Sequence, residues 1–338
     1  MARIALIVAA ASALIITAAL GFALVPLLRK MHYGQTIKEI GPTWHKNKQG
    51  TPTMGGLMFV IGSAAGVFLG WLAVAAQMQD YIGEGAATGG QSIILCLLTA
   101  ISFGFVGFVD DFIKVVKKRN LGLMARYKIV MQVLITTMFL VSLHLTGNLS
   151  TTVVLPLLGS IDFGLFFYPI SFLLIIGMVN AVNLTDGVDG LACSVTFLVG
   201  IGFMVIAALL GRFTISLFAA AIAGGCAGFL AWNFHPAKVF MGDTGSMFLG
   251  GAVVAMAYGM GQPALLLLLG VVYLIEAFSV MLQVCYFKLT HGRRLFKMTP
   301  IHHHFELSGW REEKIVAVFS FVTIIGIVLG WLFVYLCL

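Results

Sequence analysis

The chain alternates between long apolar stretches and shorter polar connections. A window of about twenty apolar residues is long enough for a helix to cross the hydrocarbon core of a bilayer. Ten such windows occur, near residues 4–28, 55–77, 91–109, 129–147, 164–181, 190–211, 213–232, 245–260, 264–287 and 315–337. The pattern therefore predicts one all-α domain over residues 1–338, with ten transmembrane helices.

Composition excludes a soluble globular protein. Of the residues, 60% are hydrophobic and only 10% are charged, which is too few to cover a core of this size. The first apolar window is longer than a signal-peptide core, and only Arg3 precedes it, so we expect a retained helix. The 5 cysteines are odd in number and lack CxxC spacing, so neither a disulfide framework nor a thiolate metal site is predicted.

Basic residues gather on one side of the predicted membrane. Of the 20 Lys and Arg residues, all but Arg3 and Arg212 fall on the first, third, seventh and ninth connections. The positive-inside rule makes the odd-numbered connections cytoplasmic and both termini external. Attraction to anionic lipid headgroups explains part of this excess.

Acidic residues follow the basic ones to the same side. Asp110, Asp111, Asp186, Asp189 and Asp243 all lie at the membrane edge of connections predicted to be cytoplasmic. Carboxylates next to hydrocarbon are costly and tend to be retained for function. The arrangement predicts an active site at the cytoplasmic membrane interface.

The first acidic motif is FVGFVDDFIKVVKK, which ends the third apolar window. Asp110 and Asp111 are adjacent, so their charges repel unless cations offset them. Such a pair suits a hard cation such as Mg²⁺, which takes oxygen ligands. The alternative is a solvated helix end with an ordinary ion pair between Asp110 and Lys114.

The second motif is MVNAVNLTDGVDGLA, residues 178–192. Asn183, Asp186 and Asp189 recur every third residue, so on a helical turn they share a side, and the glycines let a ligand approach the backbone. A calcium loop of the EF-hand type is excluded, because the twelfth position is Ser194 rather than Glu. A simple turn also uses Asn, Asp and Gly, but needs fewer uncompensated acids.

The third motif is FHPAKVFMGDTGSMFLGG, residues 234–251. Glycines and Ser246 around Asp243 suggest a loop that leads into a helix amino terminus, where free N–H groups favour anions. It is not a Walker loop, because it lacks the lysine and the spacing. Phosphate would repel Asp243 unless a metal lay between them, so Asp243 is a candidate Mg²⁺ ligand.

The ninth connection is the most basic and leads into PIHHHFE. A purification tag is disfavoured because the run is short and internal. A zinc site is disfavoured because three consecutive side chains point in different directions. Basic residues beside hard-metal carboxylates describe a diphosphate site, to which neutral imidazoles would donate hydrogen bonds. The early GTPTMGG, residues 50–56, is expected to form a mobile lid or turn, or a simple loop.

Four motifs, DDFIK, NLTDGVDGL, FMGDTGS and PIHHHFE, follow one another on alternate connections. In this order the chain closely resembles the MraY family of phospho-N-acetylmuramoyl-pentapeptide transferases, over essentially its whole length and including PTMGG. The wider superfamily of polyprenyl-phosphate N-acetylhexosamine-1-phosphate transferases shares the acidic motifs. The three histidines point to the MraY family within it.

The resemblance implies a Mg²⁺-dependent enzyme of the bacterial cytoplasmic membrane. Such an enzyme transfers phospho-MurNAc-pentapeptide from its UDP carrier to undecaprenyl phosphate, giving lipid I and UMP in peptidoglycan synthesis. Its partners are UDP-MurNAc-pentapeptide, undecaprenyl phosphate and membrane lipid, with no nucleic acid. The resemblance also suggests a homodimer, which no motif supports.

The same resemblance assigns residue roles. It implies that Asp110, Asp111, Asp243 and His302 are catalytic, with Asp243 as the main Mg²⁺ ligand and Asp110 as a second. The substrate-binding residues it implies are Lys114, Lys128, Asn183, Asp186, Asp189, Phe240, Ser246, His303 and His304. Phe240 is expected to stack on uracil, and the two lysines to neutralise phosphate. Two mechanisms are open. The lipid phosphate attacks the sugar-linked phosphate directly, or Asp243 or Asp110 first forms a covalent phospho-aspartate, which the lipid phosphate then attacks.

Two other functions remain open from the sequence. One is transfer of GlcNAc-1-phosphate to the same lipid. The other is a cation-coupled transporter, although transporters usually place coupling acids near mid-membrane, and here only Glu276 is deep in a window. Glu276 is expected to pair with another helix, to line a lipid groove or to face a polar pocket.

Overall fold

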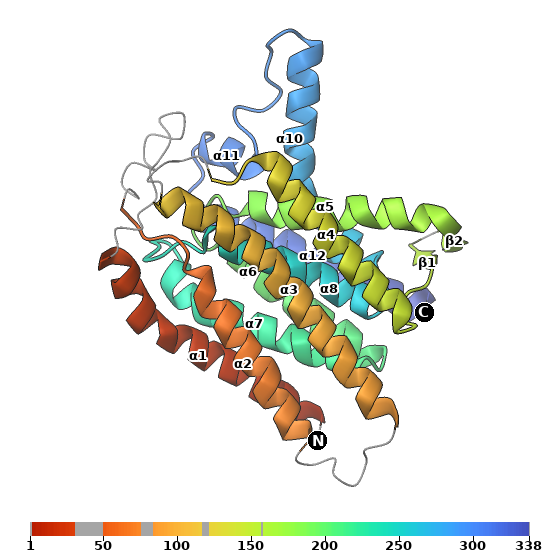
Figure 1. The fold of residues 1–338 in the computed structure, drawn as a ribbon. Coiled ribbons are helices and arrows are strands. Elements are labelled where there is room, and N and C mark those ends of the chain that lie inside the picture. The colour runs from red at the N-terminus through yellow and green to blue at the C-terminus, as the bar shows by residue number, and fades with distance from the viewer. Residues whose placement is uncertain (1, 31–49, 76–83, 117–121, 157, 338) are drawn as a thin grey trace.

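The computed structural model describes residues 2–30, 50–75, 84–116, 122–156 and 158–337, and these form a bundle of helices (Figure 1). Several basic residues of the first and third predicted connections, at positions 38, 46, 48 and 117–119, lie outside the described part of the chain. In chain order the elements are α1 Ala2–Lys30, α2 Gly56–Ala75, α3 Glu84–Val116, α4 Ala125–Leu145, β1 Thr152–Leu155, β2 Gly159–Asp162, the 3₁₀ helix η2 Gly164–Phe166, α5 Phe167–Thr185, α6 Leu191–Leu209, α7 Phe213–Asn233, α8 Gly242–Gly259, α9 Leu265–Leu269, α10 Val271–Leu289, α11 Ile301–Glu306 and α12 Glu312–Cys337.

Within the described residues, 9 helices are long and apolar enough to cross a membrane. The predicted class, an all-α multi-pass membrane protein, is confirmed. Helix α8 occupies the eighth predicted window but is not one of these 9, because its 18 residues include the polar first turn with Asp243 and several glycines, which lower its hydropathy. The count of ten spans and the external position of the termini therefore remain predictions.

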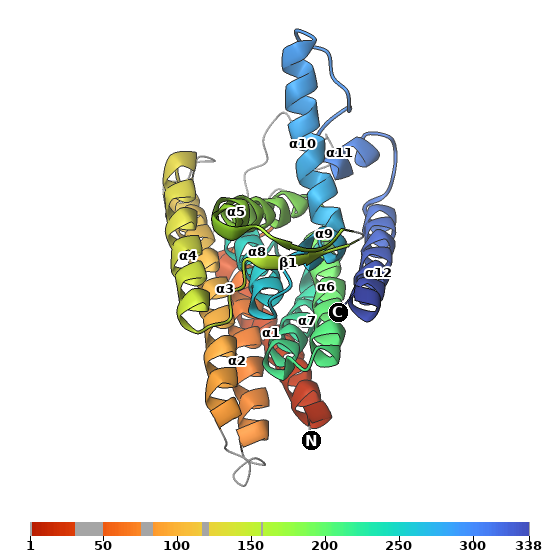
Figure 2. The same ribbon diagram turned by 90° about the vertical axis from the view of Figure 1, so that its right-hand side faces the viewer.

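Helix α8 forms the centre of the bundle, enclosed by its neighbours (Figure 2). Every residue from Thr244 to Gly259 is buried. Its closest partner is α3, and the two backbones touch at Gly107, where a Cβ atom would clash with the carbonyl oxygen of Asp243. A side chain at Gly107 would therefore push α3, which carries Asp110 and Asp111, away from α8, which carries Asp243.

The ninth predicted window, residues 264–287, is divided at Gly270 into α9 and α10. A Cβ atom at Gly270 would lie 2.5 Å from the carbonyl oxygen of Leu266, so the chain turns here where a larger residue would clash. Beyond this break α10 leaves the bundle and extends past the other helices, with α11 beside it (Figures 1 and 2). Apolar side chains such as Phe278, Met281 and Leu282 are exposed on α10, as expected for contact with lipid.

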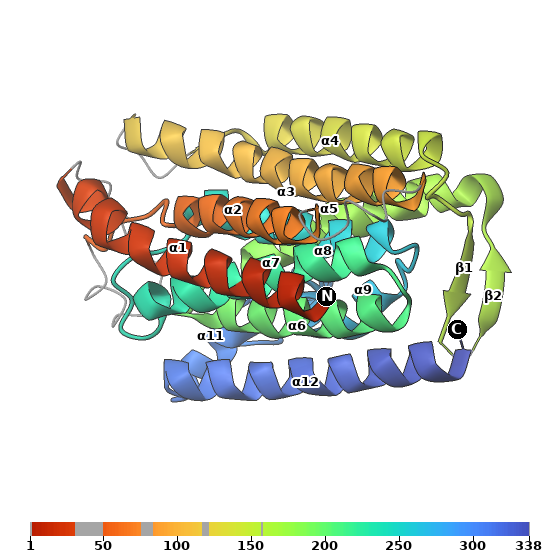
Figure 3. The same ribbon diagram turned by 90° about the horizontal axis from the view of Figure 1, so that it is seen from below.

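A two-stranded hairpin between α4 and α5 was not predicted. Strands β1 and β2 pair antiparallel, with Thr152 opposite Asp162 and Leu155 opposite Gly159. Asp162 accepts hydrogen bonds from the Thr151 hydroxyl at 2.7 Å and from the Gly164 N–H at 3.0 Å, which closes the hairpin. Figure 3 shows both termini toward the end of the bundle that carries this hairpin. The acidic motifs lie at the opposite end.

Candidate active site

Three carboxylates meet where the end of α3 passes the start of α8. Asp110, Asp111 and Asp243 each offer an oxygen, and these oxygens all lie within 4.8 Å of one another. Asp110 and Asp111 are buried, at 4% and 3% exposure. The two motifs are more than a hundred residues apart in sequence, so the close approach of α3 and α8 is what builds this cluster, which we call the aspartate cluster.

Asp111 holds the amino terminus of α8. Its Oδ1 accepts a hydrogen bond from the backbone N–H of Asp243 at 3.2 Å. Its Oδ2 accepts from the backbone N–H and the hydroxyl of Thr244, at 2.8 and 2.7 Å. A carboxylate at this position satisfies donors that have no partner within the helix and interacts favourably with the helix dipole. Asp111 therefore fixes the turn that carries Asp243.

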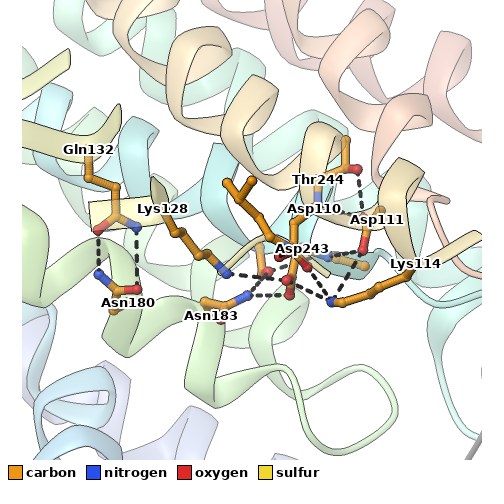
Figure 4. Close-up of polar contacts among 12 residues, drawn as sticks. Asp110, Asp111, Lys114, Lys128, Gln132, Asn180, Asn183, Asp243 and Thr244 are labelled. Atoms are coloured by element: carbon orange, nitrogen blue, oxygen red, sulfur yellow. Dashed lines mark hydrogen bonds and ion pairs between the residues drawn. The ribbon is translucent and has the colours of Figure 1, made fainter. Parts of the chain in front are cut away.

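Two lysines neutralise much of the negative charge (Figure 4). Lys114 Nζ lies 2.5 Å from Asp110 Oδ2 and 2.9 Å from Asp243 Oδ2. Lys128 Nζ, from α4, lies 3.2 Å from the same Asp243 oxygen. The pair between Asp110 and Lys114 that the sequence allowed is present, but Lys114 also bridges to α8. With all five groups ionised, one negative charge remains for a further cation.

Asn183 and Ser246 support Asp243 from the other side. Asn183 Nδ2 donates to Asp243 Oδ1 at 2.8 Å and to the Ser246 hydroxyl at 2.7 Å. One turn earlier on α5, Asn180 exchanges amide hydrogen bonds with the buried Gln132 of α4, at 2.9 and 3.3 Å (Figure 4). This amide pair fixes α5 against α4, and so sets the positions from which Asn183 and Lys128 reach Asp243.

The second motif does not present its three polar residues on one side. Helix α5 ends at Thr185, and Asp186 has a non-helical backbone, so the three-residue repeat stops there. Burial, followed by the charges of Asp243, Asp111 and Asp189, raises the pKa of Asp186 well above its usual range.

Asp189 is directed to different partners. Its Oδ2 lies 3.1 Å from His235 Nδ1 and accepts from the Ala237 N–H at 3.0 Å. Its own N–H donates to Glu312 Oε2 at 3.1 Å, at the start of α12. Asp189, His235 and Glu312 form a second group whose ligand atoms lie within 4.8 Å of one another. The expectation of a shared side therefore fails for Asp189.

The GTPTMGG segment is tied to the loop that precedes α8. The Phe240 N–H donates to the Pro52 carbonyl at 2.8 Å, and the Gly55 N–H donates to the Phe240 carbonyl at 2.8 Å. The Gly56 N–H donates to the Met241 carbonyl at 3.0 Å. These bonds correspond to a turn rather than a free lid, and they leave the half-buried Phe240 ring close to the start of α8.

The three histidines lie on the short helix α11 and have separate partners. His303 Nδ1 is 2.6 Å from Glu306 Oε2. His304 Nδ1 accepts from the Lys297 N–H at 3.2 Å. Of the two groups of described residues that could hold a metal ion, neither contains these histidines. Each imidazole is instead oriented by a contact of its own.

His302 pairs with Glu276, 3.0 Å away between Nδ1 and Oε1. Both side chains have 0% exposure. Of the three roles open for Glu276, the structure shows the first, pairing with another helix.

Sequence reasoning missed several of these contacts. Thr244 follows Asp243 directly, yet nothing in the motif indicates that its hydroxyl binds Asp111. Gln132 and Asn180 did carry a signal, because amide side chains inside apolar windows are expected to find partners. His235 and Glu312 carried none, because their pairing with Asp189 depends on how the connection after α7 and the start of α12 pack against the loop after α5.

Comparison with known protein families shows which class of enzyme this chain belongs to. Residues 93–261 match the model of glycosyl transferase family 4, and residues 48–60 match signature 1 of the phospho-N-acetylmuramoyl-pentapeptide-transferases. With a membrane-spanning helical fold and a buried aspartate cluster, the chain is a membrane-embedded glycosyl transferase. Relatives named phospho-N-acetylmuramoyl-pentapeptide-transferase then narrow the class.

The relative from Halalkalibacterium halodurans is 44% identical over 95% of this chain and 94% of its own length. Those from Acetivibrio thermocellus and Caldicellulosiruptor bescii are 43% and 46% identical, over 92% and 89% of this chain and 90% and 88% of their own lengths. The chain belongs to the phospho-N-acetylmuramoyl-pentapeptide transferase family. The predicted family, its transferase function and its multi-pass membrane location are confirmed.

Proposed function

We propose that the aspartate cluster is where this chain transfers phospho-MurNAc-pentapeptide from UDP to undecaprenyl phosphate, giving lipid I and UMP. The supporting observation is the joining of Asp110, Asp111 and Asp243 with Lys114 and Lys128 at one end of a membrane-spanning bundle. A soluble nucleotide sugar and a lipid phosphate can both reach a site at that membrane edge. We place this end in the cytoplasm on the charge asymmetry of the connections.

The residues of the cluster fit Mg²⁺. All the ligand atoms are carboxylate oxygens, which Mg²⁺ prefers, and the uncompensated charge favours a cation. Asp243 and Asp110 would hold the ion, because the lysine side chains that contact them can turn to the phosphates, whereas backbone N–H groups at the start of α8 hold both oxygens of Asp111. When bound, Mg²⁺ would offset the charge of the diphosphate and of the leaving UMP.

The lysines supply the remaining positive charge. Lys114 and Lys128 already point at Asp243 and would neutralise phosphate oxygens placed beside it. Asn183 and Ser246 hold the Asp243 carboxylate in one orientation. Around this centre we assign Phe240 to stacking on uracil. The remaining residues assigned to the substrate pocket are Asp186, Asp189, His302, His303 and His304.

Direct attack by the lipid phosphate is the mechanism that we favour. A phosphate with a second pKa near 6 is already mostly ionised at neutral pH, so it needs positioning more than a base. A bond forms between its oxygen and the β-phosphorus, while the bond from that phosphorus to the bridging oxygen breaks and UMP leaves with the electron pair.

Release of UMP from purified protein in detergent tests the function. It is expected only with both substrates and Mg²⁺, and UDP-GlcNAc in place of the muramoyl substrate should give none. Exchange of labelled UMP into the nucleotide substrate without lipid separates the mechanisms. Direct attack predicts no exchange, and clear exchange would establish the covalent route instead.

A homodimer belongs to the same proposal. Native mass spectrometry of the protein in lipid nanodiscs should give twice the chain mass. A single-chain mass at all protein concentrations would refute it.

A further inference from the structure

The pair formed by Glu276 and His302 lies outside the aspartate cluster, and the function proposed above gives Glu276 no role. Glu276 comes from α10 and His302 from α11, and both are completely buried. One contact joins them, and the outer atoms, Glu276 Oε2 and His302 Nε2, have no hydrogen-bond partner among the described residues. Burying such groups costs free energy, so an arrangement that leaves two atoms unpaired needs a reason beyond stability.

The chemistry of the contact fixes the direction of its proton. An ionised carboxylate only accepts, so the Nδ1 atom of His302 must be the donor. A neutral imidazole that carries its proton on Nδ1 has a lone pair on Nε2. Toward any neighbouring polar group, Nε2 is then an acceptor, whereas the sequence led us to expect a donor to phosphate.

The Nε2 atom faces the loop between α5 and α6. A Cβ atom at Gly187 would clash with Nε2, so the imidazole rests directly against the backbone of this glycine. Gly187 directly follows Asp186 in the loop of the second motif. A continuous series of contacts thus runs from the α10 carboxylate through the imidazole to the loop of the second motif.

We propose that Glu276 is a positioning residue that acts through His302. It holds the imidazole with its proton on Nδ1, so that the ring packs on Gly187 with an unprotonated Nε2 and keeps the loop that carries Asp186 in place for the nucleotide sugar. This inference rests on the proposed function of the aspartate cluster for its kinetic test. The competing explanation is a brace that only attaches α11 to α10.

The first test is spectroscopic and does not depend on activity. In protein labelled with ¹⁵N-histidine, the His302 signals are assigned by their loss in His302→Gln. We expect Nδ1 protonated and Nε2 unprotonated in the parent. Protonation of Nε2, alone or together with Nδ1, would overturn the proposal even if the transferase assay succeeds.

The second test is a double-mutant cycle on turnover with Glu276→Gln and His302→Gln. Glutamine has the same shape as glutamate, but its amide group can either donate or accept, so the proton position is no longer fixed. Glu276→Gln should lower kcat about 10- to 100-fold, the range seen where a carboxylate orients a metal-bound imidazole, with a smaller change in KM. In the His302→Gln background it should cause no additional loss.

Ser279→Ala is the matched control. Ser279 is buried on the same helix, and its hydroxyl donates to the Glu276 carbonyl at 2.7 Å, so this change disturbs α10 without touching the imidazole. We expect unchanged turnover and an unchanged His302 signal. Equal losses in Ser279→Ala and Glu276→Gln would favour the brace. Multiplying losses in the cycle would show that Glu276 does not act through His302 and would overturn the proposal. An inactive parent would instead count against the proposed function.

Discussion

Asp111→Asn is the substitution that best distinguishes a structural role of Asp111 from a catalytic one. The Asp111 carboxylate accepts three hydrogen bonds from the first turn of α8, two from the backbone N–H groups of Asp243 and Thr244 and one from the Thr244 hydroxyl. Asparagine keeps one acceptor oxygen and points an NH₂ group at donors. The substitution should therefore loosen the amino terminus of the central helix.

The magnitude follows from these contacts. A hydrogen bond to a charged group contributes about 1.5–3 kcal/mol, and a charge at a helix terminus adds up to about 2 kcal/mol when partly buried. Losing the charge and one of the two acceptor oxygens should lower the free energy of unfolding by about 3 kcal/mol. For a chain of this size that corresponds to a fall of about 5 °C in melting temperature.

Tryptophan fluorescence during thermal unfolding in detergent, together with turnover, measures both effects. Asp111→Asn should lose stability and activity together, because Asp243 moves with the helix. Thr244→Val removes only the hydroxyl donor to the Asp111 carboxylate and should cost about 1.5–3 kcal/mol. Asp243→Asn should lose activity at an unchanged melting temperature. If Asp111→Asn keeps the parent melting temperature while losing activity as Asp243→Asn does, Asp111 belongs with the reacting carboxylates and the capping role is wrong.

Four further predictions concern the rest of the site. Asp243→Asn and Asp110→Asn should each lower kcat at least about 10³-fold with normal folding, measured as UMP release, and normal turnover in Asp243→Asn would refute its role as a metal ligand. Lys128→Met should lower kcat about 100-fold, because one ammonium beside Asp243 is lost, and a change in KM alone would contradict this. Asn180→Leu leaves the buried Gln132 amide unpaired and should cost about 1–3 kcal/mol by thermal unfolding, part of which the double change with Gln132→Leu should restore. Chelation with EDTA should abolish UMP release and added Mg²⁺ should restore it, whereas turnover that survives chelation would exclude a divalent metal.

The sequence predicted the bundle because hydrophobic length is a local property. Nine of the predicted windows contain a helix that meets the length and hydropathy of a span. Its failures concern where helices break or end and where short strands form. The break at Gly270 depends on the carbonyl of Leu266 and on Met178 of another helix, and the loss of periodicity after Thr185 depends on where α5 ends. The hairpin at Thr152–Leu155 is too short for its pattern to be distinguished from a loop.

The candidate site was predictable to the level of its residues but not of their partners. The aspartates could be gathered from their common side of the membrane, since topology alone brings them to one interface. Topology does not indicate that Asp189 binds His235, or that Glu276 finds His302. Those pairings are set by the packing of α10, α11 and α12, which the apolar pattern does not specify.

The two adjacent aspartates of α3 have different roles, which the DD motif alone does not distinguish. Neighbouring residues on a helix point about 100° apart, so Asp110 and Asp111 have different main partners although both reach the aspartate cluster. Asp110 turns to Lys114 and to the Leu123 N–H, 2.8 Å away, while Asp111 turns to the first turn of α8. If Asp111 swung round to bind an ion, it would release the turn that holds Asp243. The pair therefore divides its work, with one carboxylate for the reacting centre and one for the helix that brings Asp243 to it.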